Sequence, residues 1–325
     1  MDVGESGPES FDKRDYALEK EIDLRELFAA LWQGKWIIVA VTVCCSLASL
    51  FYALSLPNIY RAEALLAPAN VDDSGGAGAL AAQYGGLASL AGINIDSFGN
   101  GQNKIALGVE VLKSRKFISD FVARRKILVP LMATNGWSLK DNSLEFDKDI
   151  YDISLNEWVR NVDPPRMPKP SLLEAYEAFI EIQNVSQDSD TGFVKISIDH
   201  YSPYVAKQWV DWLIEDINST LRQHDVSEAE KSILYLENQL ETTSFAELQT
   251  IFYQLIEEQT TTIMLANARP EYLFRTLDPA VVEEYSFKPQ RAIIFIVGTL
   301  IGMVLSAAIV VLRAYILPGQ LIMSR

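Results

Sequence analysis

Two uncharged apolar stretches, one near each end of the chain, dominate the hydrophobic pattern. Residues 36–56 and 292–312 each run for 21 positions without Asp, Glu, Lys or Arg. As helices they would cross about 30 Å of hydrocarbon, and core helices of soluble proteins seldom stay apolar on every face for that length. We therefore predict two transmembrane helices. The first follows a polar stretch rich in Asp and Glu, which does not fit the short basic start of a removable signal peptide.

Three short runs between the two spans predict β-strands. Residues 59–66 are bounded by proline and partly alternate between apolar and polar positions. Residues 180–185 and 193–198 are strand-like runs around the turn-rich segment 188–192, a pattern typical of a β-hairpin.

Helix signals surround these strands, which predicts an α+β fold rather than an alternating parallel sheet. Residues 104–126 carry apolar side chains at helical spacing and are predicted to form one amphipathic helix. Capping boxes at Ser154–Glu157 and Ser171–Glu174 predict two short helices on either side of the Pro-rich segment 163–170.

A long helix is predicted to begin at Ser202 and Pro203, because a capping serine followed by proline at the first helical position is a strong start signal. An approximate 3,4 repeat carries the helix to about Thr243, a length of roughly 60 Å. The apolar positions of that repeat are Val226, Ala229, Ile233, Leu236 and Leu240.

The repeat is interrupted at Thr243, Ser244 and Phe245, where Ser244 and Glu247 have the spacing of a new capping box. Both ends of the segment are tied to one membrane, so we expect the chain to reverse here and return as an antiparallel helix. In this hairpin, residues 226–240 would pack against residues 245–263. A stutter within one continuous helix is the alternative.

An amphipathic helix is also predicted ahead of the first span. Asp23 and Glu26 have capping-box spacing, and an apolar stripe follows at helical intervals. The stripe suits the surface of the inner leaflet, and a cytoplasmic binding face is the alternative. Its members are Leu24, Leu27, Phe28, Leu31 and Trp32.

Basic residues favour the two tails, which predicts that both termini are cytoplasmic and that residues 57–291 are exported. The tails carry Lys13, Arg14, Lys20, Arg25, Lys35, Arg313 and Arg325, whereas the loop ends near the spans carry Arg61, Arg275, Lys288 and Arg291. The loop has 21 Lys or Arg residues against 34 Asp or Glu residues, so nucleic acid is excluded as a partner on electrostatic grounds.

These elements predict a linear division of the chain into seven parts. The order is a cytoplasmic tail with an amphipathic helix (1–35), the first span (36–56), a periplasmic α+β base domain (57–202), the long helix and its return (203–270), a segment returning to the base and membrane (271–291), the second span (292–312) and a cytoplasmic tail (313–325).

Catalytic and metal-binding patterns are missing from the sequence. The two histidines, His200 and His224, belong to no metal spacing, and the only cysteines, Cys44 and Cys45, lie inside the first span. The Gly-rich stretch 74–101 lacks the Gly-Lys-Ser/Thr of a phosphate loop. We therefore expect no enzyme activity, no cofactor and no metal.

A basic group lies along the predicted helix 104–126 and leaves two interpretations open. It could meet a lipid pyrophosphate or an acidic neighbouring subunit, or it could be a solvated face with cations near a helix C-terminus. Its members are Lys113, Arg115, Lys116, Arg124, Arg125 and Lys126.

Several segments between about residue 20 and residue 315 resemble the chain-length determinant (Wzz) family of polysaccharide co-polymerases. The likeness is specific in combination, although each segment alone is weak. The segments are Glu21 to Leu27, Tyr60-Arg61-Ala62-Glu63, Leu112-Lys113-Ser114-Arg115, Tyr201-Ser202-Pro203, Gln254 to Thr260 and Asp278-Pro279-Ala280.

Around the second span the chain departs from the family pattern. Of the spaced prolines ahead of the span, Pro279 and the Lys288-Pro289 pair remain. Gly298 and Gly302 are followed by Ser306 where a third glycine is usual, yet the small residues still form one flat face for close helix packing. On the first span, Ala40, Cys44 and Ala48 are predicted to form the matching face.

The resemblance implies a ring-shaped homo-oligomer, octameric in the family, that works beside a Wzy-type polymerase in the bacterial inner membrane. It implies a non-enzymatic role in setting the modal length of O-antigen or a related glycan, with undecaprenyl-linked polysaccharide as a further partner. Some relatives carry a cytoplasmic tyrosine kinase, but only a short tail with Tyr315 follows the second span here, so that activity is not expected.

A membrane-anchored periplasmic adaptor or sensor is the alternative function, since such proteins also place helical hairpins on an α-rich base. The tails are short for a sensor's output domain, and an adaptor usually has one anchor. The sequence identifies no sugar-contacting residue under either reading.

Overall fold

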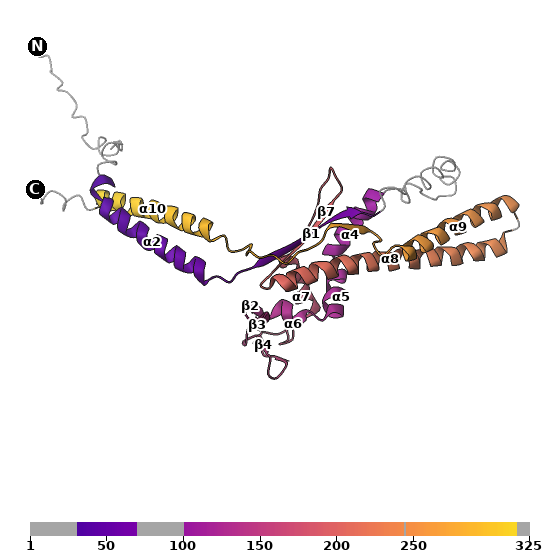
Figure 1. The fold of residues 1–325 in the computed structure, drawn as a ribbon, viewed down its shortest axis with the longest axis horizontal. Helices are drawn as coiled ribbons and strands as arrows, with labels where there is room; N and C mark the ends of the chain where they lie inside the picture. Colours follow the sequence, from indigo (N-terminus) through magenta and orange to yellow (C-terminus); the bar gives the residue numbers. More distant parts are fainter. Residues whose placement is uncertain (1–30, 70–100, 244, 317–325) are drawn as a thin grey trace, which may run out of the picture. The chain divides into compact units, whose positions relative to one another are not determined.

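The computed structural model describes residues 31–69, 101–243 and 245–316 (Figure 1). The chain divides into two compact units: one contains the two apolar helices, and the other is Pro57–Pro289. The predicted capping box at Asp23 and most of the Gly-rich stretch lie outside the described residues.

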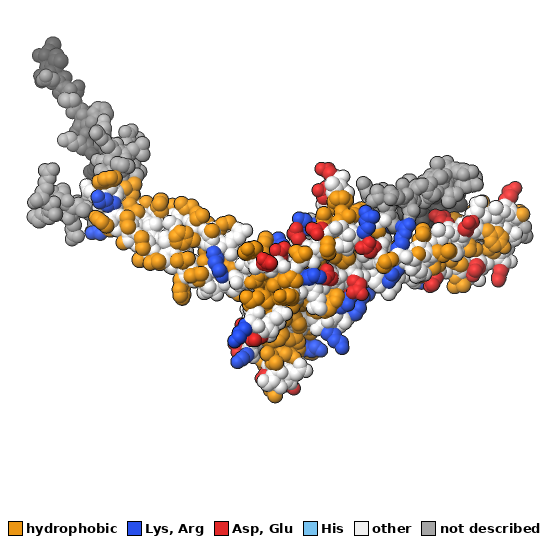
Figure 2. Space-filling model, viewed as in Figure 1, with side chains coloured by type: hydrophobic (Ala, Val, Ile, Leu, Met, Phe, Trp, Pro, Cys, Tyr) orange, Lys and Arg blue, Asp and Glu red, His pale blue; other side chains and the backbone are white. Residues whose placement is uncertain are grey.

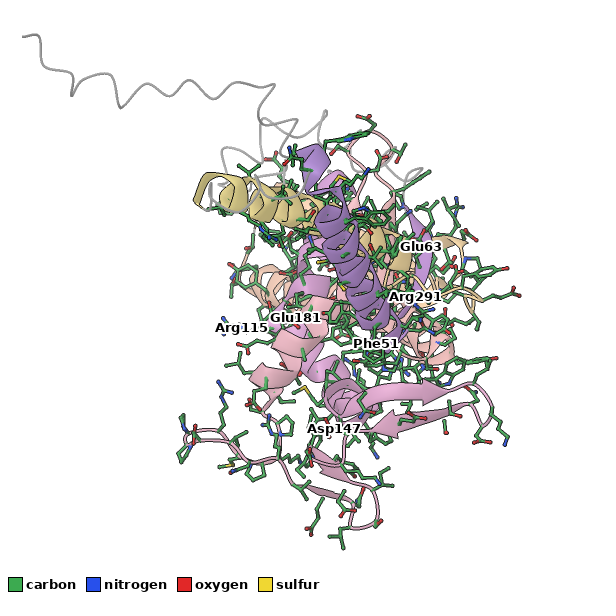
Figure 3. The ribbon with its side chains drawn as sticks, turned by 90° about the vertical axis from the view of Figure 1, so that its left-hand side faces the viewer. Phe51, Glu63, Arg115, Asp147, Glu181 and Arg291 are labelled. Carbon is green, nitrogen blue, oxygen red and sulfur yellow. The ribbon has the colours of Figure 1, made fainter. Side chains whose placement is uncertain are left out.

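The first unit is a pair of apolar helices, α2 (Lys35–Ser55) and α10 (Arg291–Ile316), which pack against each other. Their mean hydropathy is 2.4 and 2.7, and both are long enough to cross a membrane. Large side chains point away from the contact between the helices; Phe51 of α2, for example, is 78% exposed (Figure 3). Two apolar helices near the ends of the chain are therefore confirmed.

A four-stranded antiparallel sheet with the order β6-β7-β1-β8 forms the centre of the second unit. The predicted strands are present as β1 (Tyr60–Pro68), β6 (Gln183–Gln187) and β7 (Val194–His200). β8 (Phe274–Asp278) was not predicted. On the polar face of β1, Glu63 pairs with Lys195 of β7 at 3.1 Å (Figure 3).

The single helix predicted over residues 104–126 is instead two helices, α4 (Gly101–Lys113) and α5 (Arg115–Arg125). The break has a local cause: Ser114 is extended, and its hydroxyl accepts a hydrogen bond from the Phe117 backbone and so starts a new helix. The predicted apolar positions, including Leu112 and Phe121, are buried.

Two predicted capping boxes have different outcomes. Ser171 and Glu174 form the expected reciprocal box and start α7 (Leu172–Ile182), which follows the short α6 (Leu128–Met132). The helix predicted at Ser154–Glu157 is wrong.

The segment predicted to start this helix is instead the turn of a β-hairpin between β4 (Tyr151–Asp152) and β5 (Glu157–Trp158). The Asp152 carboxylate accepts hydrogen bonds from the backbone of Ser154 and Leu155, which forms a turn in place of a helix start. A neighbouring hairpin, β2 (Thr134–Ser138) and β3 (Ser143–Phe146), ends beside Asp147 (Figure 3).

The core lies between the sheet and the helices that cover it. Side chains from the first half of α8 (Pro203–Thr242) face the sheet, and Trp209, Leu213 and Ile217 are almost fully buried. The Phe179 ring of α7 bridges Phe121 and Trp209, with ring centroids 5.4 and 6.0 Å away. This shared core joins α5, α7 and α8.

Beyond the sheet, α8 continues and packs against α9 (Ala246–Ala268) as a helical hairpin (Figure 1). Ser202 caps α8 and Pro203 opens it, as predicted. Ser244, the predicted cap of the return helix, lies outside the described residues. α9 begins after Phe245, whose side chain makes no capping bond, and Glu247 stands in its first turn. Gln249 donates a hydrogen bond to the Thr243 carbonyl at 2.8 Å, which ties the start of α9 to the end of α8.

His200 connects the end of β7 to the start of α8. Its Nδ1 accepts a hydrogen bond from the Ser202 backbone at 3.1 Å, and its ring lies 4.9 Å from that of Trp209. The Nε2 atom therefore carries the proton and lies 3.5 Å from the Pro130 carbonyl. Burial disfavours the charged ring and lowers the pKa of His200 to about 4.

We predict that the folded chain loses stability as the pH falls from 6.5 to 4. Over that range His200 binds a proton in the unfolded chain but stays neutral in the folded chain. The free energy of unfolding should therefore drop by about 3 kcal/mol. Unfolding of the detergent-solubilised chain across this pH range measures the slope. In His200→Gln the slope should flatten, and an unchanged slope would assign it to other groups.

Candidate functional site: the Asp199 junction

Asp199 of β7 joins three segments that are distant in sequence. It lies opposite Arg61 of β1 in the strand register, and the Arg61 guanidinium holds both carboxylate oxygens at 2.6 and 2.9 Å. Lys288, from the segment that precedes α10, donates to the same carboxylate at 2.9 Å. We call Arg61, Asp199, Phe287 and Lys288 the Asp199 junction.

Backbone hydrogen bonds reinforce the junction. The Ile59 backbone N–H donates to the Lys288 carbonyl at 2.9 Å, and the Ile59 carbonyl accepts from Phe287 and Lys288. The Arg61 guanidinium lies over the Phe287 ring, 3.6 Å from its centroid. The chain that follows α2 and the chain that precedes α10 are therefore held together at one edge of the sheet.

The electrostatics of the junction keep its aspartate ionised. Burial by itself would raise the pKa of Asp199, but hydrogen bonds and charges from Arg61 and Lys288 outweigh it and hold the pKa below its ordinary value. The hydrogen bond to Asp199 likewise raises the pKa of Arg61. A carboxylate whose two oxygens are both occupied is poorly placed for acid–base work, so the junction suits a structural connection.

Of the predicted pre-membrane residues, Lys288 belongs to the junction through its side chain, and Pro289 follows it directly. Pro279 is an exposed residue that follows the last residue of β8. Sequence reasoning singled out Lys288 but found neither Asp199 nor the partnership with Arg61.

In the apolar unit, Gly298, Gly302 and Ser306 of α10 face α2. A Cβ atom at Gly302 would lie 2.6 Å from Cys45, and one at Gly298 would overlap Ser49. The Ser306 hydroxyl lies 3.5 Å from that of Thr42. These short approaches require glycine or another small residue on α10.

The face proposed for α2 is not the one that meets α10. Ala40, Cys44 and Ala48 are exposed. The contact is made by the neighbouring face of α2, which carries Thr42, Cys45, Ser46 and Ser49. Ser46 and Thr299 share a hydrogen bond of 3.0 Å across the contact. Polar hydroxyl pairing, rather than small size alone, distinguishes this face.

We predict that Gly302→Leu separates α2 from α10 without blocking membrane insertion, because the leucine would occupy the space of Cys45. In a Cys44→Ala background, reaction of Cys45 with a membrane-permeant maleimide should speed up. Val304→Leu changes a 69% exposed position on α10 and is the control. Equal Cys45 reactivity in the two variants would contradict the packing argument.

The basic group is largely paired with carboxylates of the same chain. Arg125 contacts Glu215 and Asp216 at 2.6 Å each, and Arg124 lies 3.7 Å from Asp216. Lys116 pairs with Asp120 at 2.7 Å. Because of this pairing, we interpret the basic group as a charged helix face rather than as a binding site for an anion.

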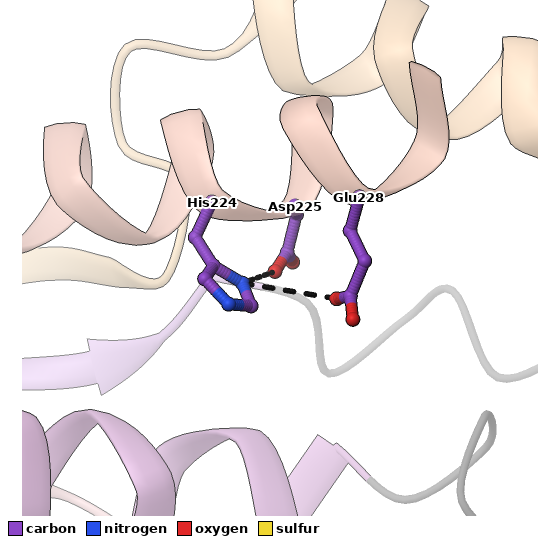
Figure 4. A group of neighbouring side chains, drawn as sticks. All are labelled: His224, Asp225 and Glu228. Atoms are coloured by element: carbon purple, nitrogen blue, oxygen red, sulfur yellow. Dashed lines mark hydrogen bonds and ion pairs between the residues drawn. The ribbon is translucent and has the colours of Figure 1, made fainter. Parts of the chain in front are cut away.

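His224, Asp225 and Glu228 lie together on α8 (Figure 4). The Nδ1 atom of His224 is 3.4 Å from Asp225 and 3.8 Å from Glu228, a spacing that could admit a divalent cation. However, Asp225 already accepts hydrogen bonds from Tyr272 at 2.6 Å and Lys104 at 3.2 Å. Sequence analysis overlooked this group, whose signal was carboxylates one and four positions after a histidine.

The chain matches two family models. Residues 20–124 match Wzz, described as chain length determinant protein, and residues 230–315 match GNVR, described as G-rich domain on putative tyrosine kinase. None of the curated proteins matches it.

Solved structures of two co-polymerases are similar to the chain. One, a full-length bacterial polysaccharide co-polymerase, is 12% identical with a TM-score of 0.38, and the match covers 92% of this chain and 100% of that one. The other, a fragment of WzzB, a polysaccharide co-polymerase from Salmonella Typhimurium, is 13% identical with a TM-score of 0.27 and coverages of 71% and 100%.

Proposed function

This chain belongs to the chain-length determinant (Wzz) family of polysaccharide co-polymerases, and from this we propose that it sets the modal length of O-antigen or a related surface polysaccharide made by a Wzy-type polymerase. The observation that carries the proposal is the pair of family matches, which include both apolar helices, β1, α9 and β8. The proposed setting is the bacterial inner membrane, with both termini cytoplasmic and residues 57–291 in the periplasm.

The proposed role is that of a non-enzymatic scaffold. Family membership supports a homo-oligomer, for which we propose a ring, with the helical hairpin rising from the base domain. Exposed apolar side chains on the helical hairpin support a role for it in contacts between subunits. Leu234, Tyr235 and Tyr253 are each more than 60% exposed. In this role the Asp199 junction would hold together the two segments that lead to the spans while polysaccharide grows.

Deletion of the gene followed by electrophoresis of the surface polysaccharide tests the proposal. We expect the modal distribution of lengths to disappear on deletion and to return when the intact gene is restored. If the polysaccharide keeps the same modal length without the gene, the chain is not its length determinant. A membrane-anchored adaptor or sensor would then be the better interpretation.

A further inference from the structure

Three aromatic rings pack together at the edge of the sheet where β1 begins. The Trp137 ring of β2 lies 5.6 Å from Tyr60, the first residue of β1, and 6.0 Å from Tyr204 in the first turn of α8. Leu139 follows in the β2–β3 turn, and Tyr285 precedes the Asp199 junction. We call Tyr60, Trp137, Leu139, Tyr204 and Tyr285 the aromatic edge.

Much of this edge is open to solvent in the isolated chain. Leu139 is 77% exposed and Tyr285 is 82% exposed, and Tyr204 is about half exposed. Figure 2 shows hydrophobic side chains over the first turns of α8. A leucine that is 77% exposed at a turn leaves most of its apolar area without a partner in the described chain.

Two short tethers limit how far this edge can lie from the bilayer. α2 ends at Ser55, so five peptide steps of at most about 3.5 Å each reach Tyr60, a span of about 17 Å. Only three steps, about 10 Å, separate Lys288 from Arg291, where α10 begins. At 21 residues, α2 is about as long as the hydrocarbon layer is thick, so its ends belong at the membrane surface.

The chemistry of the edge matches the headgroup layer. Tyr and Trp combine an apolar ring with a polar tip and are enriched at membrane–water interfaces. Lys140, exposed next to Leu139, has a long stem that allows its ammonium group to stay in the headgroups while the leucine enters the acyl boundary. The short tethers and the chemistry of the side chains therefore indicate the same neighbour, the headgroup layer of the membrane.

We propose that the aromatic edge binds the surface of the bilayer that α2 and α10 cross, and that Leu139 inserts deepest. The proposal rests on the two apolar helices being spans, and it does not require the role in polysaccharide length. Under this proposal, the β2–β3 hairpin is the part of the base domain that contacts lipid.

Spin labels on the full chain in vesicles of phosphatidylcholine and phosphatidylglycerol test this contact. A label is attached to Leu139→Cys, in a background of Cys44→Ala and Cys45→Ser, and its collisions with oxygen and with a water-soluble nickel chelate are compared. Asp190→Cys, at an exposed site in the turn between β6 and β7, is the control. Tyr285→Cys gives a second reading from the edge.

At Leu139 and Tyr285 we expect an oxygen-to-nickel collision ratio several times that at Asp190. A high nickel rate at Leu139, equal to that at Asp190, would place the turn in water and overturn the proposal. Low rates with both reagents would show that protein, such as a second copy of the chain, covers the edge, and this would also overturn it. Neither result would bear on the control of polysaccharide length.

Discussion

Asn218→Ala is expected to lower the free energy of unfolding by about 4 kcal/mol, the largest effect we predict for one substitution. Asn218 lies on the sheet-facing side of α8 and is 5% exposed. Its Oδ1 accepts from the backbone N–H groups of Leu273 and Phe274 at 2.8 and 2.9 Å, and its Nδ2 donates to the Phe274 carbonyl at 3.0 Å. Alanine would leave three buried backbone groups without partners.

Chemical unfolding of the detergent-solubilised chain, followed by tryptophan fluorescence, measures this loss. Asn238→Ala on the same helix is the matched control, because that side chain is exposed and bonds only within its own helix. It should cost less than about 0.5 kcal/mol. Similar losses in both variants would mean that the α8-to-β8 connection adds no special stability.

Asp199→Ala is expected to cost about 3 kcal/mol, because it leaves Arg61 and Lys288 without their shared carboxylate in a mostly buried site. The estimate is near the low end for buried pairs because the Lys288 side chain is 52% exposed. The variant should also free the segment before α10, which backbone hydrogen exchange at Phe287 and Lys288 would detect as faster exchange.

Asp211→Ala is the control for this substitution, since Asp211 forms a half-exposed pair with Lys207 within one helix. It should change stability little and leave exchange at Lys288 unaltered. The pH sense follows from the lowered pKa of Asp199: its contribution is complete above the ordinary carboxyl pKa and is lost as the pH falls below it. Exchange at Lys288 that stays slow in Asp199→Ala would show that the backbone bonds alone hold this edge.

The parts of the fold predicted correctly are those with local signals. The uncharged runs gave the helices α2 and α10, and the Ser202-Pro203 pair marked the start of α8 to the residue. β8 was missed because a five-residue strand has little pattern of its own, and its place is set by β1 and by Asn218. The helix predicted from the capping box at Ser154 was wrong because the Asp152 carboxylate accepts hydrogen bonds from backbone groups of this segment and forms a turn.

The candidate site was less accessible to sequence reasoning, because its contacts join residues far apart in the chain. Arg61 and Asp199 are 138 positions apart and meet through the β1–β7 register, which no local pattern fixes. On α2, small residues occur on two faces, and composition did not distinguish Ala40, Cys44 and Ala48 from the Thr42–Cys45–Ser49 face that contacts α10. Hydroxyls able to pair across the helices were the missed signal.

The central claim, that the chain controls length without making or cutting polysaccharide, is tested most directly by reconstitution. The purified full chain is added to vesicles that hold a Wzy-type polymerase and its lipid-linked repeat units, and the products are resolved by electrophoresis. We predict a broad distribution from the polymerase alone and a distribution with a distinct mode when the chain is present, whereas the chain alone leaves preformed polysaccharide unchanged. The same broad distribution with and without the chain, or shortening of polysaccharide by the chain alone, would contradict the account.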